Sequence, residues 1–264
     1  MSETAEPTNP DLSPRRWPWL IALAAALLSL FQLWQPLAGF LPPGALPFEW
    51  ALGMQPAAYF RPVHLCWILC LGLWIYPLQI RGVKYSWVDA LMCLLVLWAS
   101  MRILQFNYSG IDHLLNGLSP PDFVAGLIIV GATLELARRS IGPVMWGIGL
   151  VFIGYAAFGN VLPDVLATRG FSFERIIRFQ VFTGAGLYGA PLGIAAGAVF
   201  SFVLFGAFLQ VTGAGKMLID LSFAAAGKSR GGPAKASVLA SAAMGSISGS
   251  AIANTVTTGS LTIP

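Results

Sequence analysis

The chain has 264 residues, of which 56% are hydrophobic and 10% are charged, and its formal net charge is +4. About 25% of the residues of an ordinary soluble domain are charged, so this composition predicts an integral membrane protein. The basic residues stand at the ends of apolar runs rather than in one patch. This pattern follows the positive-inside rule and argues against nucleic acid as a partner.

Residues 1–16 are polar, and we interpret them as a short disordered cytoplasmic tail rather than a signal peptide. The apolar runs that follow predict an all-α, multi-span helical bundle in the lipid bilayer. The six expected spans lie at about 17–40, 62–80, 87–106, 122–137, 144–158 and 188–209.

The positions of the basic residues predict that the N-terminus is cytoplasmic. With that orientation, the basic residues at 15–16, 81–84 and 138–139 all fall on the cytoplasmic side. Arg61 and Arg102 do not fit, and we expect both side chains to snorkel to the interface.

Between the fifth and sixth spans, aromatic and aliphatic residues alternate with charged ones over 171–179. This pattern predicts an amphipathic helix on the outer surface, with its charges in solvent. After the sixth span, the sequence predicts a short helix over 216–227. A basic turn at 228–232 follows on the cytoplasmic side. Pro233 then stands where a new helix would begin.

Residues 245–262 carry eight hydroxyl side chains and one amide in a segment that is otherwise typical of membrane helices. Starting from Pro233, a helix reaches Ser248 after about 15 residues, or roughly 22 Å, which is short of the 30 Å hydrocarbon core. The sequence therefore predicts a re-entrant hairpin over 233–264, as in many secondary transporters. One alternative stays open, a single long helix whose Gly/Ser face packs on a neighbour.

Five motifs in the second half occur in the order seen in one transporter family. They are Gly186-Leu-Tyr-Gly-Ala-Pro-Leu-Gly-Ile-Ala-Ala196, Phe202-Val-Leu-Phe-Gly-Ala-Phe-Leu209, Thr212-Gly-Ala-Gly215, Gly231-Gly-Pro-Ala-Lys235 and the hydroxyl run 245–259. The chain thereby resembles the fused permeases of tripartite ATP-independent periplasmic (TRAP) transporters, closest to the TAXI branch. The resemblance is specific over 184–264 and loose over 17–160. It departs from the usual pattern at Gly184-Ala185 and Gln210-Val211.

The resemblance implies an elevator-type secondary transporter in the bacterial inner membrane. Residues 17–160 would be a scaffold like the small subunit, and 161–264 would open the large transport subunit, with 216–227 as an arm helix. A periplasmic TAXI-type binding protein would deliver a small organic anion, a carboxylate, and sodium would drive its uptake. The hairpin arm that closes the sequence suggests that the remainder of the permease is missing.

The resemblance also places the site in the hairpin, with no catalytic residue, no cofactor and no metal other than sodium. Sodium would bind at Ser246, Ser248, Gly249, Ser250 and Asn254, and the substrate at Thr257 and Thr258. Neutral oxygens suit sodium, and free helix N-termini favour a carboxylate without a basic residue. The absence of any charge over 236–264 agrees with this.

Three other functions compete with this interpretation. A facilitator or channel would also line its pore with neutral oxygens, and another kind of secondary transporter could share the hairpin. An intramembrane enzyme would need acid–base or ligand clusters within the spans. Glu135 is the one acidic residue near a span interior, and we expect it to pair with Arg139 four residues on.

Overall fold

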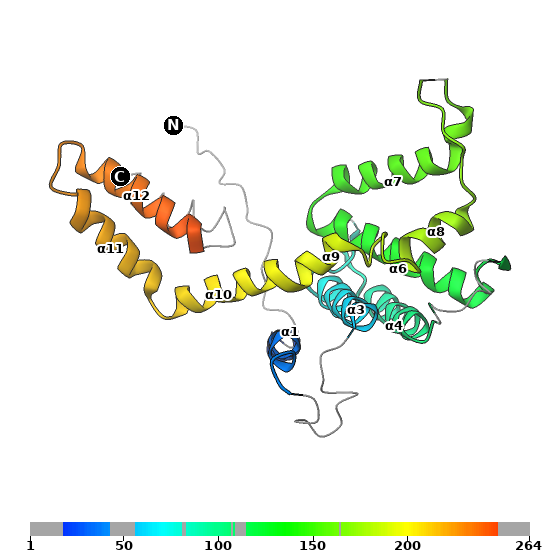
Figure 1. Cartoon of the computed structure of the whole chain (residues 1–264), viewed down its shortest axis with the longest axis horizontal. Helices are drawn as coiled ribbons and strands as arrows, with labels where there is room; N and C mark the ends of the chain where they lie inside the picture. The colour runs from blue at the N-terminus through cyan, green and yellow to red at the C-terminus, as the bar shows by residue number, and fades with distance from the viewer. Residues whose placement is uncertain are drawn as a thin grey trace.

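The computed structural model describes residues 18–42, 56–80, 83–106, 108, 115–163 and 165–247, which are almost wholly helical (Figure 1). Six of the helices in these ranges are long and apolar enough to cross a membrane. They are Trp19–Ala38, Ala57–Ile75, Ser86–Leu104, Pro120–Ser140, Pro143–Val161 and Ala190–Leu209. The six predicted spans and the all-α fold class are therefore confirmed.

The elements follow one another in a simple order. The first half holds α1 (Pro18–Ala38), α3 (Ala57–Ile75), β1 (Gln79–Ile80), β2 (Val83–Lys84), α4 (Ser86–Leu104), α6 (Pro120–Ser140), α7 (Pro143–Phe158) and the 3-10 helix η1 (Gly159–Val161). The second half holds α8 (Phe173–Val181), α9 (Ala190–Ile194), the π-helix η2 (Ala195–Val199), α10 (Phe200–Val211), α11 (Ala214–Ala226) and α12 (Gly232–Ile247).

The second span begins and ends about five residues earlier than the sequence predicts. Pro56 precedes the first helical residue, and its fixed φ suits a helix start. At the other end Pro77 forces Tyr76 out of the helical region, to φ −114° and ψ 74°. The residues that follow form the antiparallel hairpin β1–β2 instead of a last helical turn.

The helices α3, α4 and α6 pack side by side and enclose the main core (Figure 1). Small residues let the helices approach closely: a Cβ on Gly126 would lie 2.4 Å from Cγ2 of Ile177, on α8. The buried cluster consists of Leu65, Leu69, Val96, Ala99, Ile103, Ala125, Ile129, Ala132, Val181, Phe182 and Tyr188.

The predicted amphipathic helix is α8, and its apolar face belongs to this core. Ile176, Ile177 and Val181 are buried, and α8 packs on α6. Glu174 is not a purely solvated charge, because its Oε1 accepts a hydrogen bond of 3.0 Å from the Leu118 backbone N–H. The helix is therefore anchored to the bundle as well as amphipathic.

Most of the apolar surface of the spans faces outward. Helix α7 buries none of its residues, and Val144, Val151 and Phe152 are each more than 65% exposed. A soluble monomer rarely exposes contiguous apolar patches larger than a few hundred Å². A lipid bilayer therefore covers this surface.

From α9 on, the chain extends away from the bundle (Figure 1). Helix α9, η2 and α10 run on as one rod, and α11 and α12 turn back as an antiparallel pair at its far end (Figure 1). Helix α1 contacts both α3 and α10. It therefore lies where the bundle meets the rod.

Candidate functional site

The helix that leads into the hydroxyl-rich segment is α12, and it pairs with α11. Ala236, Ala240 and Met244 are buried at intervals of four residues, so they share one face of α12. On α11 that face meets small residues, and a Cβ on Gly215 would lie 3.3 Å from Cε of Met244. This contact of small residues is typical of helix pairs in membranes.

Helix α12 begins where the sequence predicts. Gly231 has a φ of 69°, which a residue with a Cβ rarely adopts, and the helix follows directly at Gly232. Its 16 described residues, up to Ile247, span about 24 Å along the helix axis. Its last charged residue is Lys235, so the rest of the helix is neutral.

Of the seven predicted site residues, the structure places only Ser246. It stands on the last described turn of α12, its side chain is exposed, and its Oγ donates to the Ala243 carbonyl at 2.7 Å. The other six, Ser248, Gly249, Ser250, Asn254, Thr257 and Thr258, lie outside the described residues. The sodium and substrate sites remain predictions.

A second polar cluster joins the bundle to the rod, and the sequence analysis missed it. Gln32 of α1 is 4% exposed, and its Nε2 lies 2.7 Å from Nδ1 of His64 and 2.7 Å from the Ala196 carbonyl oxygen. The amide donates to both, so His64 accepts at Nδ1. Gln32 Oε1 is buried without a partner in the described residues.

The acceptor in this cluster lies in the π-helix η2. There the Phe200 N–H reaches back five residues to the Ala195 carbonyl, so the helix is locally wider than an α-helix. The Ala196 carbonyl accepts the Gln32 amide, which links residues 164 positions apart. Single π-turns within α-helices are frequent at functional sites.

His64 is a buried member of this cluster. Because α3 begins at Ala57, His64 lies in its second or third turn and is only 6% exposed. A glutamine within an apolar span was the signal that could have revealed this cluster. Polar residues in membrane spans usually face another helix.

One turn before His64 on the same helix, Arg61 makes a second contact between bundle and rod. Its Nη1 donates to the Tyr188 carbonyl at 2.8 Å. The phenol of Tyr188, just before the span Ala190–Leu209, is buried, and burial raises its pKa well above the usual range. It therefore stays protonated at physiological pH.

Charged pairs tie the bundle together at both ends. At one end Arg102 pairs with Asp122 at 2.7 Å, so its charge is neutralised within the bundle rather than only by snorkelling. At the other end Arg139 binds Asp89 at 2.5 Å and Glu135 at 2.7 Å. The predicted Glu135–Arg139 pair is confirmed, and Asp89 extends it to α4.

The fold and these sites define a class, a multi-span helical membrane protein with a small-residue helix pair that leads into a neutral, hydroxyl-rich segment. Comparison with protein families identifies the family within this class. The family model of the tripartite ATP-independent periplasmic transporter, DctM component, matches residues 128–264, which is just over half of the chain. The chain belongs to this family, whose members are transporters and not enzymes.

The match begins at Ile128 within α6, so it covers α7 to α12 and the hydroxyl-rich segment. A comparison with curated proteins and one with solved structures each gave no significant match. The chain is thus a membrane component of a TRAP transporter.

Proposed function

We propose that this chain is the permease of a sodium-coupled TRAP transporter of the TAXI branch, with scaffold and transport parts fused in one polypeptide. It takes up an organic anion, a carboxylate, that a periplasmic binding protein delivers to the bacterial inner membrane. Membership of the DctM family supports a TRAP permease. The motifs over 184–264 support the TAXI branch.

The observation that carries the proposal is the composition of the segment that α12 enters. Helix α12 begins at Gly232 and carries the chain into residues 245–262, which hold eight hydroxyls and an amide and no charged residue. In hydrocarbon such groups are stable only against a partner, a cavity or an ion. Sodium is the ion that neutral hydroxyl and carbonyl oxygens suit, as in other transporters with broken helices.

The arrangement of the helices suits an elevator. The bundle of α3, α4, α6 and α8 shares one apolar core and would form the fixed scaffold, which adds α8 (Phe173–Val181) to the expected scaffold part 17–160. Helix α11 (Ala214–Ala226) coincides with the expected arm helix 216–227. It connects the rod to α12, so a movement of the hairpin would pass through it.

The test is uptake into proteoliposomes by the purified transporter with its binding protein. We expect uptake only when an inward sodium gradient and the substrate-loaded binding protein are both present. Uptake that needs the binding protein but is unchanged when potassium replaces sodium would remove the sodium coupling. Uptake that runs equally well in both directions without a gradient would favour a facilitator.

The orientation is tested separately with single cysteines in a version that lacks Cys66, Cys70 and Cys93. Ser172 and Ser229 are both exposed, on opposite sides of the proposed topology. We expect an impermeant thiol reagent added outside to label S172C and not S229C. Labelling of S229C from outside would show that α12 enters from the periplasm.

A further inference from the structure

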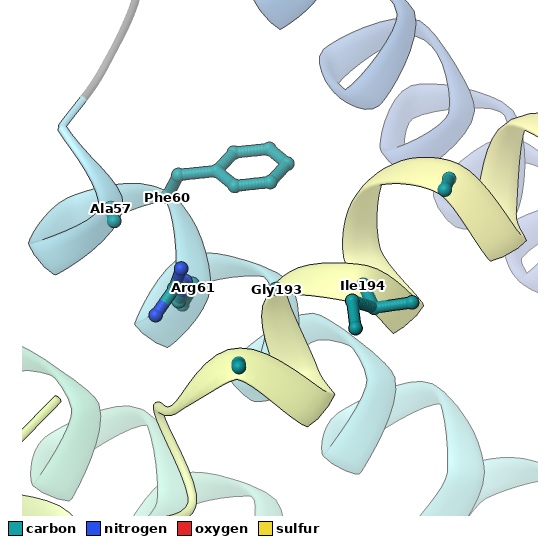
Figure 2. A pocket seen from close by; sticks show the side chains of 7 residues that line it. Ala57, Phe60, Arg61, Gly193 and Ile194 are labelled. Carbon is teal, nitrogen blue, oxygen red and sulfur yellow. The ribbon is translucent and has the colours of Figure 1, made fainter. Parts of the chain in front are cut away.

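A hollow of about 470 Å³ lies on the outer face of the contact between α3 and the rod (Figure 2). Its α3 wall carries Phe60 and Arg61, and its other wall is formed by α9 and η2, with Gly193 and Ile194 (Figure 2). Arg61 is the one charged side chain among the residues that line it. The hollow is therefore apolar with a single positive charge.

Arg61 differs from the two other arginines that link helices of the bundle. Arg102 and Arg139 are each paired with a carboxylate. Within the described part of the chain, Arg61 has no carboxylate partner, and its hydrogen bond goes to the neutral Tyr188 carbonyl. An unpaired charge in a membrane span is costly unless an anion or water meets it.

The guanidinium of Arg61 lies against the helix at Gly193. A Cβ at Gly193 would lie 2.8 Å from its Nη2 and 3.0 Å from its Cζ, so a larger residue there would displace the group from this position. One Nη1 hydrogen is used by Tyr188, and the guanidinium carries four further N–H donors. Two of these donors on one edge of the guanidinium form a planar fork, the group that binds phosphate through two parallel hydrogen bonds.

The rest of the hollow opens to the side that the bilayer covers. Ile194 is 58% exposed, and Phe60 is held in place by stacking on Phe31 at 5.6 Å between ring centroids. Arg61 is four residues after the start of α3, or about 6 Å along the helix axis from the end of the span. At that depth a charged group meets lipid headgroups while apolar walls meet acyl chains.

We propose that this hollow binds one phospholipid, with the phosphate on the Arg61 guanidinium and an acyl chain along Phe60 and Ile194. The lipid would neutralise the charge that no carboxylate of the described chain meets. It would also bridge the scaffold helix α3 and the rod. The proposal concerns a different region from the hairpin and does not depend on sodium coupling.

The experiment is native mass spectrometry of the purified, delipidated transporter during titration with phosphatidylglycerol, diacylglycerol or inorganic phosphate. We expect one phosphatidylglycerol to bind tightly, diacylglycerol to bind at least about tenfold more weakly, and inorganic phosphate not to compete. Arg61→Gln should weaken phosphatidylglycerol binding by about tenfold or more, since hydrogen bonds to a charged group are lost. Arg61→Lys should restore part of it, because the charge remains without the fork.

A second variant keeps the test decisive if Arg61→Gln fails to fold. Ile194→Trp fills the hollow but leaves the Arg61–Tyr188 hydrogen bond in place, and it should also abolish tight binding. Arg175→Gln is the matched control, because Arg175 lies on α8 over the Phe171 ring and away from the hollow. Equal phosphatidylglycerol binding in Ile194→Trp and the parent would overturn the proposal, as would full displacement by inorganic phosphate.

Discussion

The bundle and the helix pair α11–α12 are held together by different interactions. The bundle combines a shared apolar core with ion pairs at both ends, and neighbouring side chains occupy the space beside its Gly72 and Gly126. In the described part of the rod and of α11–α12 there is no ion pair, and small residues make the contact. These interactions hold the bundle helices in one arrangement, whereas few interactions attach the helix pair α11–α12 to the bundle.

Between these two regions lies a narrow set of polar contacts. Gln32 donates to the Ala196 carbonyl in the rod, and Arg61 donates to the Tyr188 carbonyl, two residues before the rod begins at Ala190. Hydrogen bonds of this kind cost little to exchange when other partners are available. The junction therefore suits a place where a moving part meets a fixed one.

The largest expected effect comes from breaking the ion pairs of the bundle. Arg139 is 5% exposed and Asp89 is 9% exposed, so Arg139→Ala leaves a buried carboxylate unpaired. We expect a loss of about 3–5 kcal/mol in stability, seen as a lower midpoint of thermal unfolding of the purified protein.

Arg138→Ala is the matched control, because Arg138 is the preceding residue, is 38% exposed and, within the described residues, pairs with Glu135 alone. It should cost at most about 1 kcal/mol. Equal losses in the two variants would mean that burial of the Arg139 network contributes nothing to the rigidity of the bundle.

The second prediction compares one glycine from each region. At Gly126 a new Cβ would lie 2.4 Å from Ile177 and 3.2 Å from the Phe182 ring, so Gly126→Ala should cost about 1–3 kcal/mol by overpacking. At Gly215 the nearest atom is the flexible end of Met244, at 3.3 Å, so Gly215→Ala should change stability by less than about 1 kcal/mol. The reverse order, measured in the same unfolding assay, would show that the helix pair is the more tightly packed region.

The third prediction concerns the junction. Gln32→Ala leaves His64 Nδ1 and the Ala196 carbonyl without the amide donor, which should cost about 1–2 kcal/mol and open η2 locally. Faster hydrogen exchange over 195–200 would show this opening. Ser29→Ala on the same helix, whose exposed Oγ only bonds the Ala25 carbonyl, should leave the exchange unchanged. Unchanged exchange in both variants would exclude a role for Gln32 in holding the π-helix.

The sequence predicts local features well and long-range contacts poorly. Hydropathy located six spans, and the four-residue spacing of Glu135 and Arg139 located their pair, because both signals are contained within one helix. The Gln32–Ala196 contact spans 164 residues, and its acceptor is a backbone carbonyl that no residue type marks. The partner of Arg102 was missed for the same reason, since Asp122 lies on another helix.

For the candidate site, too, the sequence predicts the local features and not the long-range contacts. The start of α12 and its neutral character follow from Gly231, Pro233 and the absence of charge after Lys235. The arrangement of oxygens around an ion depends on which segments face one another across a cavity. That arrangement is not encoded in the spacing of Ser246 and its neighbours alone.

The central claim is that the hydroxyl-rich segment after α12 binds the sodium that drives transport. It is tested most directly by sodium titration of uptake in Ser246→Ala, Ser250→Ala and Asn254→Ala. Ser237→Ala is the matched control, because Ser237 is on the same helix and its Oγ also donates to the carbonyl three residues back. It stands nine residues earlier, about 13 Å along the axis.

One ligand lost from a site of several oxygens weakens binding by roughly 1–3 kcal/mol, or about 5- to 150-fold. The account therefore predicts that half-maximal uptake shifts to higher sodium concentration in the three test variants and stays at the parent value in Ser237→Ala. Unchanged sodium dependence in all four variants would show that the hydroxyls are a helix-packing surface and that sodium binds elsewhere.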